Sequence, residues 1–114
     1  MARVTRDAGR PRYEAETPFM GRVIEYALLR GWLVHHCRSV WTASGYKTPI
    51  QGSPGFPDLC MTRLSRVVFA EVKDTYNKPT GLQAEWLATL AASGKVETFL
   101  WRPKDEELIW SILA

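Results

Sequence analysis

The sequence has little of what marks disulfide-rich, membrane-spanning or repeat proteins. It contains only two cysteines, and their spacing matches no disulfide framework. No apolar run approaches the ~20 residues of a membrane-spanning helix, and no internal repeat or low-complexity run is present. The N-terminal residues also lack the apolar segment of a secretory signal. We therefore expect a cytoplasmic protein with no membrane association.

Excess charge is scarce as well. The net charge of +3 permits a polyanionic partner but does not require one. Its distribution is more informative, because four arginines precede the first apolar periodicity: Arg3, Arg6, Arg10 and Arg12. We expect residues 1–15 to form a mobile basic arm, which is either a solvated tail or a contact for DNA phosphates.

The rest of the chain, residues 16–114, is long enough for one domain with its own core. Apolar residues recur at helical spacing over 19–30, which predicts a helix with Thr17 as its N-cap, or with a start one turn earlier, and with Gly31 as its stop signal. "WLVHHCRSVW" then predicts a buried strand. "TASGYKTPIQGSPGFP" predicts a long loop, because it is rich in Gly, Pro, Ser and Thr.

An antiparallel hairpin is predicted between Asp58 and Lys73. Its strands cover 58–63 and 67–73, with a short turn centred near Ser65. Such a turn pairs residues whose numbers sum to about 130, and a sum of 129 or 131 brings the charged residues together. We also expect the second strand to be central in its sheet, because both of its faces begin apolar.

Three charged side chains meet in this register. Strand residues alternate between faces, so Asp58 shares a face with Glu71 and Lys73, and its Cβ atom lies ~5 Å from that of its pairing partner. Carboxylates are hard oxygen ligands for Mg²⁺, and a lysine beside them can orient or deprotonate an attacking water. The cluster therefore indicates either metal-assisted hydrolysis or a structural salt bridge at the end of a strand.

The remaining pattern is loop, helix, strand and helix. "KPTGLQAEWLATLAASGK" predicts a helix with Thr80 as its cap and Gly94 as its stop, "VETFLW" a strand, and "PKDEELIWSILA" a closing amphipathic helix. The five tryptophans are mostly assigned to the core, although Trp41 and Tyr46 border the long loop and could stack on an unpaired base. The predicted order of elements is α-β-β-β-α-β-α.

This order, with Asp and Glu-x-Lys on the hairpin, resembles the core of the PD-(D/E)xK nucleases. "PGFPDL", "FAEVK", "GLQAEWL" and "FLWRP" are similar to the small stand-alone branch of VRR-NUC (virus-type replication-repair nuclease) domains. The similarity covers nearly all of 16–113 and leaves the basic arm outside. It implies an α/β fold with a restriction-endonuclease-like α-β-β-β-α-β core and an additional C-terminal helix.

The resemblance also implies roles for individual residues of the hairpin. Asp58, Glu71 and the backbone carbonyl of Val72 would ligate Mg²⁺ or Mn²⁺, and Lys73 would be the catalytic lysine. Each role matches the chemistry of its side chain, but the assignment comes from the family pattern.

Further positions carry more than one interpretation. Glu16 aligns with a metal-binding glutamate early in the first family helix, while Glu25 on the same predicted helix is a competing acid. Gln83 occupies a family position near the active site, yet with Thr80 it also fits a capping box. His36 matches a family histidine and lies either near the scissile phosphate or in the interior as a hydrogen-bonded residue. The candidate DNA contacts are Arg10, Arg12, His36 and Lys47.

We therefore expect a Mg²⁺- or Mn²⁺-dependent endodeoxyribonuclease. Family likeness implies structure-selective cleavage of branched DNA, such as a four-way (Holliday) junction, by a homodimer. Two alternatives stay open. One is a DNA-binding module that kept the nuclease fold without turnover, and the other is a restriction-like endonuclease that reads sequence through the long loop.

Overall fold

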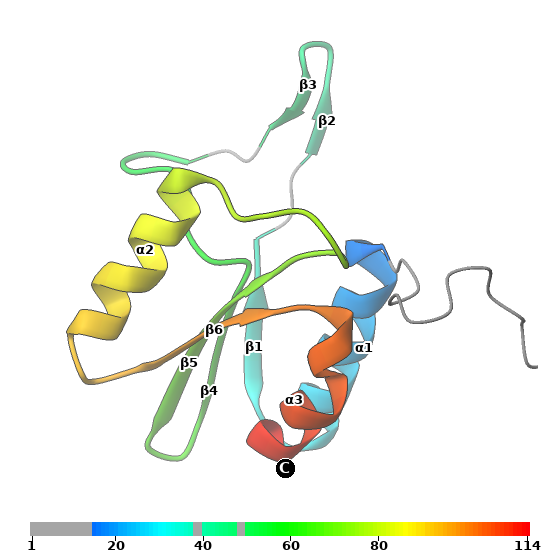
Figure 1. The fold of residues 1–114 in the computed structure, drawn as a ribbon, viewed down its shortest axis with the longest axis vertical. Coiled ribbons are helices and arrows are strands. Elements are labelled where there is room, and N and C mark those ends of the chain that lie inside the picture. Colours follow the sequence, from blue (N-terminus) through cyan, green and yellow to red (C-terminus); the bar gives the residue numbers. More distant parts are fainter. Residues whose placement is uncertain (1–14, 38–39, 48–49) are drawn as a thin grey trace, which may run out of the picture.

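Four strands form one mixed sheet in the order β1-β4-β5-β6 (Figure 1). Strand β4 pairs antiparallel with β1 and with β5, and β6 pairs parallel to β5. The strands are β1 (Leu33–His36), β4 (Leu59–Arg63), β5 (Arg66–Val72) and β6 (Glu97–Trp101).

The fold comes from a computed structural model that describes residues 15–37, 40–47 and 50–114, with the backbone alone for 40–42 and 46–47. Within these residues no helix is long and apolar enough to cross a membrane. Apart from Ala15, the predicted basic arm lies outside the described residues, and so do its candidate DNA contacts Arg10 and Arg12.

Helices cover both faces of the sheet. Figure 1 shows α1 (Glu16–Leu29) and α3 (Glu106–Leu113) on one side and α2 (Gly81–Ala92) on the other. A short 3₁₀ turn, η1 (Pro103–Asp105), leads into α3. The order of elements matches the predicted α-β-β-β-α-β-α with a small hairpin added, and the fold is of the mixed α/β class.

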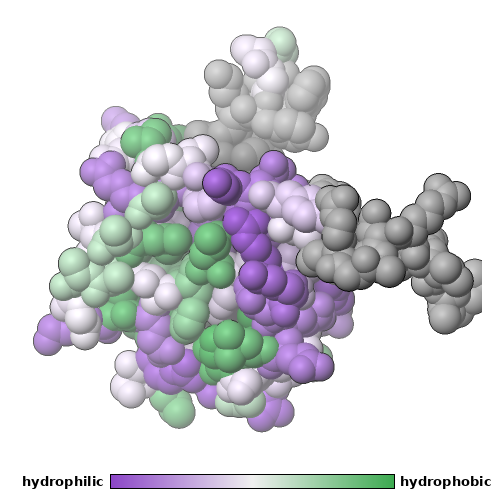
Figure 2. Space-filling model, in the orientation of Figure 1, coloured by the Kyte–Doolittle hydropathy of each residue, from purple (hydrophilic) through white to green (hydrophobic). Residues whose placement is uncertain are grey.

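The core lies between the sheet and the α1–α3 layer. Its buried apolar residues are Phe19, Met20, Val23, Ala27, Trp32, Leu59, Met61, Val68, Ala70, Val72, Trp101, Ile109 and Leu113. By contrast, α2 buries none of its residues, and Leu82 and Leu100 keep 49% and 37% of their surface exposed. Figure 2 shows apolar side chains at the surface around α2 and β6.

The β4–β5 hairpin has the predicted register. Leu59 pairs with Ala70 and Arg63 with Arg66, so paired residue numbers sum to 129 without a bulge. The turn is shorter than predicted, because Arg66 already belongs to β5. As expected, β5 is an interior strand, since it lies between β4 and β6.

The first helix has the earlier of its two predicted starts. It starts at Glu16 instead of near Phe19, and Ala15 is its N-cap, without a side-chain hydrogen bond. Thr17 is therefore not the cap. This start places the Glu16 carboxylate in the first turn of the helix, where the helix dipole favours negative charge. The stop signal is confirmed, because the helix ends at Leu29 and Gly31 follows with φ +87°.

The predicted buried strand "WLVHHCRSVW" is wrong in extent and in burial. Its strand part, β1, is an edge strand, and Leu33 is 73% exposed. Among the described residues of this segment, Trp32, just before the strand, is fully buried in the core, where its indole Nε1 donates to the carbonyl of Leu113 at 2.9 Å. An apolar, β-branched composition is common to edge and central strands, so it could not distinguish between them.

A second small sheet spans the end of the predicted strand and the start of the predicted long loop. Strand β2 (Val40–Thr42) pairs antiparallel with β3 (Gly45–Lys47), and Trp41 lies opposite Tyr46 in the register. A two-residue turn joins them, and Gly45 after it has φ +107°, which other residues rarely adopt. The glycine and serine that suggested a loop therefore mark a hairpin turn.

Candidate active site

The predicted charged residues gather where β5 leaves the sheet. The last ladder pair is Leu59 with Ala70, so continuing the same register sets Asp58 opposite Glu71. Asp58 is held there because its Oδ2 accepts the backbone N–H of Val72 at 2.9 Å. The predicted convergence of Asp58 with the end of β5 is therefore present in the structure.

Glu71 is the most unusual residue of this cluster. It is 0% exposed, and neither of its carboxylate oxygens accepts a hydrogen bond within the described residues. Its nearest described charge partner is Lys73, whose Nζ lies 3.4 Å from Oε2. Burial first, and then the charge of Asp58, raise the pKa of Glu71 to about 8, against the lowering effect of Lys73. A carboxylate in this state is costly unless a cation or a proton neutralises it.

Glu16 joins the cluster from the start of α1. Burial, followed by the charge of Asp58, raises its pKa, while Lys73 lowers it and Asp74 raises it. The Glu16 carboxylate is therefore close enough to Asp58, Lys73 and Asp74 to interact with their charges. Glu25, the competing acid, is exposed on the outer surface of the same helix, so the structure brings Glu16 to this site.

Asp74 is a site residue that the sequence analysis missed. It is only 7% exposed, and its carboxylate accepts the backbone N–H groups of Tyr76 and Asn77. The Arg102 guanidinium then donates to the carbonyls of Asp74 and Asn77. These bonds fix the loop that follows Lys73. An Asp directly before the polar stretch "TYNKPT" is typical of such a turn, and this signal was present in the sequence.

The backbone of Val72 adds a further oxygen. Neighbouring residues of a strand point their N–H and C=O groups to opposite sides, and one residue's two groups point to the same side. The Val72 N–H bonds Asp58, whereas the Lys73 N–H bonds Trp101 on the β6 side. The Val72 carbonyl therefore faces the Asp58 side, as a ligand at this site requires.

These residues fit a hard divalent cation. Within the described residues the buried Glu71 oxygens accept no hydrogen bond of good geometry and have the Lys73 ammonium 3.4 Å away. Asp58 Oδ2 accepts the Val72 N–H, and carboxylate and carbonyl oxygens are the ligands that Mg²⁺ and Mn²⁺ prefer. In the described part of the chain, no three His, Cys, Asp or Glu side chains are already arranged around one point. A cation would thus be held by Asp58, Glu71 and the Val72 carbonyl, with Glu16 adjacent.

The other predicted site residues have mixed outcomes. Gln83 forms the capping box: its Oε1 accepts the Thr80 N–H at 2.9 Å, and its own N–H donates to the Thr80 hydroxyl at 3.2 Å. His36 pairs with Leu59 and so lies on the core side of the pleat, half-buried. Lys47 belongs to β3, but its side chain is outside the described residues.

Comparisons with models of protein families, with curated proteins and with solved structures found no match for this chain.

Proposed function

We propose that this protein is a Mg²⁺- or Mn²⁺-dependent endodeoxyribonuclease with a restriction-endonuclease-like core of the VRR-NUC type. One observation carries the proposal: the fully buried Glu71 carboxylate lies beside Asp58, accepts no hydrogen bond of good geometry within the described residues, and is paired with the Lys73 ammonium at 3.4 Å. A structural role would be better served by a satisfied or apolar side chain at this position. A cation-binding role explains why two acids stay together here.

Each residue of the cluster has a part in phosphodiester hydrolysis. Asp58, Glu71, the Val72 carbonyl and Glu16 hold the cation, which when bound supplies Lewis-acid activation of the phosphodiester. Lys73 orients and deprotonates the attacking water, and its ammonium form offsets negative charge on the phosphorane-like transition state. Its Nζ lies 3.4 Å from Glu71 Oε2, next to the proposed metal-binding residues, and the Lys73 side chain as a whole keeps 14% of its surface exposed.

Family likeness extends the proposal to the substrate and the assembly. The preferred substrate is branched DNA such as a four-way junction, and the active form is a homodimer that presents two sites to two strands. This part is supported by the motifs of the hairpin, of α2 and of β6, which all lie in the expected elements.

A second candidate function is a DNA-binding module without turnover. It is favoured by the bond from Val72 to Asp58 and by the ion pair of Lys73 with Glu71, since both satisfy charges inside the protein. A restriction-like enzyme is the third, and the β2–β3 hairpin would be its reading element.

A panel of labelled DNAs separates these functions. Duplex, flap, single-stranded and four-way-junction DNAs are incubated with the protein in Mg²⁺, in Mn²⁺ and in EDTA. We expect metal-dependent cleavage, fastest on the junction. Binding of every DNA with no cleavage in either metal would leave the binding module, and cutting of plain duplex at one sequence would favour the restriction-like enzyme. Sedimentation of the junction complex reports whether one or two copies are bound.

A further inference from the structure

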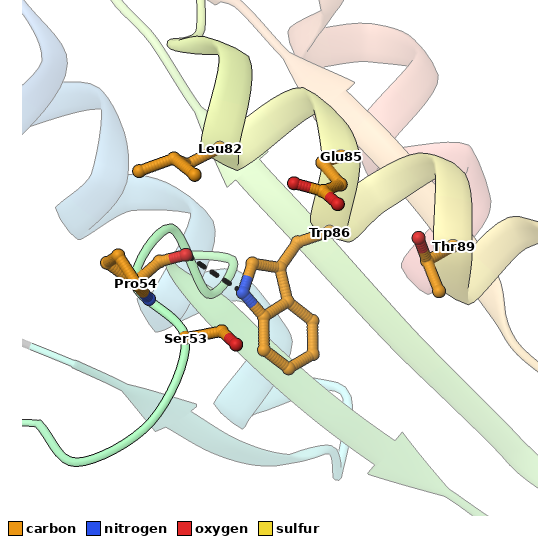
Figure 3. Close-up of a pocket in the computed structure, with 6 residues that line it drawn as sticks. All are labelled: Ser53, Pro54, Leu82, Glu85, Trp86 and Thr89. Carbon is orange, nitrogen blue, oxygen red and sulfur yellow. Dashed lines mark hydrogen bonds between the residues drawn. The ribbon is translucent and has the colours of Figure 1, made fainter.

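A cavity of about 340 Å³ opens between α2 and the loop that leads to β4 (Figure 3). Its size is within the range of small-ligand sites. The residues that line it are Ser53, Pro54, Leu82, Glu85, Trp86 and Thr89. None of these residues belongs to the charged cluster of the candidate active site.

Trp86 forms a fixed aromatic surface in this cavity. Its indole Nε1 donates to the carbonyl of Pro54 at 3.0 Å, as the dashed line in Figure 3 marks. The Phe56 ring contacts it edge-on, with centroids 5.0 Å apart, and Phe56 in turn contacts Phe69. Trp86 is only half-buried, which corrects its assignment to the core. Because the ring is already held, a flat ligand can stack on it at little cost in side-chain entropy.

The polar groups of the cavity select against phosphate. Glu85 supplies a carboxylate, and Ser53 and Thr89 supply hydroxyl groups, while none of the described residues that line the cavity is Lys, Arg or His. A carboxylate repels a phosphate but accepts hydrogen bonds from amino groups. An aromatic face beside such an acceptor matches a nucleobase with an exocyclic amino group: adenine, cytosine or guanine.

The cavity is also tied to the candidate active site through one loop. Pro54 precedes Asp58 by four residues, so their Cα atoms are at most ~14 Å apart even in a fully extended chain. Gly55 has φ +95°, and a Cβ atom there would come within 2.7 Å of the Leu82 backbone. The loop is therefore packed directly on the first turn of α2, and it positions Asp58 and the cavity together.

We propose that this cavity binds one unpaired nucleobase of a DNA strand, stacked on Trp86 with its amino group donating to Glu85. The inference builds on the proposed nuclease function, because it assigns the element that recognises unpaired DNA beside the cleaved phosphate. Bases of branched DNA are unpaired or easily unpaired at the branch, so this cavity favours such substrates over continuous duplex.

The test measures binding in EDTA, where no cleavage is expected. The probes are duplexes with a single bulged adenine, a bulged thymine or a bulged abasic residue. One stacked base contributes about 1–3 kcal/mol, so the parent should bind the adenine bulge roughly 5- to 150-fold more tightly than the abasic one. Trp86→Leu should remove this difference, and Trp110→Leu, remote on α3, should keep it. Equal dissociation constants for the adenine and abasic bulges in the parent would overturn the proposal.

Glu85 is tested through the choice of base. Glu85→Ala should remove the preference for adenine over thymine, whereas Glu107→Ala, the same charge change on an exposed part of α3, should leave it unchanged. If Trp86→Leu does not fold, Thr89→Phe fills the cavity from an exposed helix position and should abolish the base preference. A preference that survives Thr89→Phe would also overturn the proposal.

Two further measurements distinguish a site for a DNA base from a site for a free nucleoside, and distinguish the role of the cavity from the nuclease function. Free adenosine that binds as tightly as the adenine bulge would indicate a nucleoside pocket and overturn the assignment to DNA. A Trp86-dependent base preference in a protein that cleaves nothing would support the cavity and contradict the nuclease. Cleavage of junctions without any base preference would support the nuclease and overturn the assignment of the cavity to a nucleobase.

Discussion

Glu71 makes the stability of this protein depend on pH. Its pKa is about 8 in the folded chain, against 4.5 when exposed. Between these values the folded state holds a proton that the unfolded state has lost, so the free energy of unfolding falls as pH rises, by at most about 1.4 kcal/mol per pH unit. Below the lower value this contribution is fully present, and above pH 8 it is gone. We expect urea unfolding in EDTA to show the decline between pH 5.5 and pH 8.5.

The matched variant for this prediction is Glu71→Gln. A neutral amide has nothing to titrate, so the variant should lose much of the decline and be more stable than the parent at pH 8.5. Glu25→Gln, the same change on the exposed surface of α1, should keep the parent's profile. A parallel pH dependence in the parent and in Glu71→Gln would show that Glu71 is not the titrating group.

Lys73 is the residue on which turnover depends most directly. We expect Lys73→Ala to lower cleavage of a four-way junction in Mg²⁺ by at least about 100-fold, the usual contribution of a general acid or base. Folding and DNA binding should be largely intact, because Glu71 can remain protonated when its partner is lost. Comparable cleavage by variant and parent would remove Lys73 from catalysis. Lys95→Ala, an exposed lysine beyond the end of α2, is the control and should cleave like the parent.

At the scale of elements, the β4–β5 hairpin contains a strained turn. Leu64 has φ +56° and is 94% exposed, although a side chain in this region costs about 1–2 kcal/mol. Leu64→Gly should relieve the strain and raise the free energy of unfolding by about 0.5–1 kcal/mol after the entropy cost of glycine. Thermal melting should move up by a few degrees. Ser65→Gly, whose φ is not positive, is the control, and an equal effect of both variants would refute the strain.

Local rules predicted the elements whose causes are local. The cap at Thr80, the helix stops at Gly31 and Gly94, and the register of the β4–β5 hairpin are all present. Composition failed to predict strand position and burial where these depend on long-range packing. β1 is at the edge because only β4 pairs with it. Trp86 is half-exposed because it lies on α2, and this helix packs on the sheet without fully burying any of the helix residues.

The residues of the candidate site also fall into two groups, those that local rules could predict and those that depend on long-range packing. Strand alternation places Glu71 and Lys73 on one face, and the predicted register with a sum of 129 or 131 brings Asp58 to that face, so the sequence was sufficient for this part. Glu16 reaches the cluster only through the packing of α1 on the sheet, and spacing along the chain could not separate it from Glu25. The contribution of Asp74 depends on Arg102, far away in sequence, which binds the carbonyls of its loop.

At the scale of the whole molecule, the candidate site joins segments that are distant in the chain. Glu16 begins α1, Asp58 precedes β4, and Glu71 lies near the end of β5. Figure 1 shows the start of α1 beside the chain that leaves β5. Burial, followed by the charge of the Asp58 carboxylate, raises the pKa values of Glu16 and Glu71, so both acids are repelled by Asp58 when no cation is bound. Their mutual repulsion opposes the packing of α1 against the sheet.

A bound cation should therefore stabilise the entire fold. At a concentration 100 times its dissociation constant, a ligand adds about 2.7 kcal/mol to the free energy of unfolding, so Mg²⁺ or Mn²⁺ should raise the melting temperature by several degrees. The rise should be larger at pH 8.5 than at pH 6, because the cation must displace the proton of Glu71. Asp58→Asn is the sharpest variant, since its amide oxygen can still accept the Val72 N–H and preserve the loop. It should shrink the rise markedly, and Glu25→Gln should leave it intact. A metal-induced rise as large in Asp58→Asn as in the parent would place the cation elsewhere, and the charged cluster would then be a structural ion pair at the end of β5.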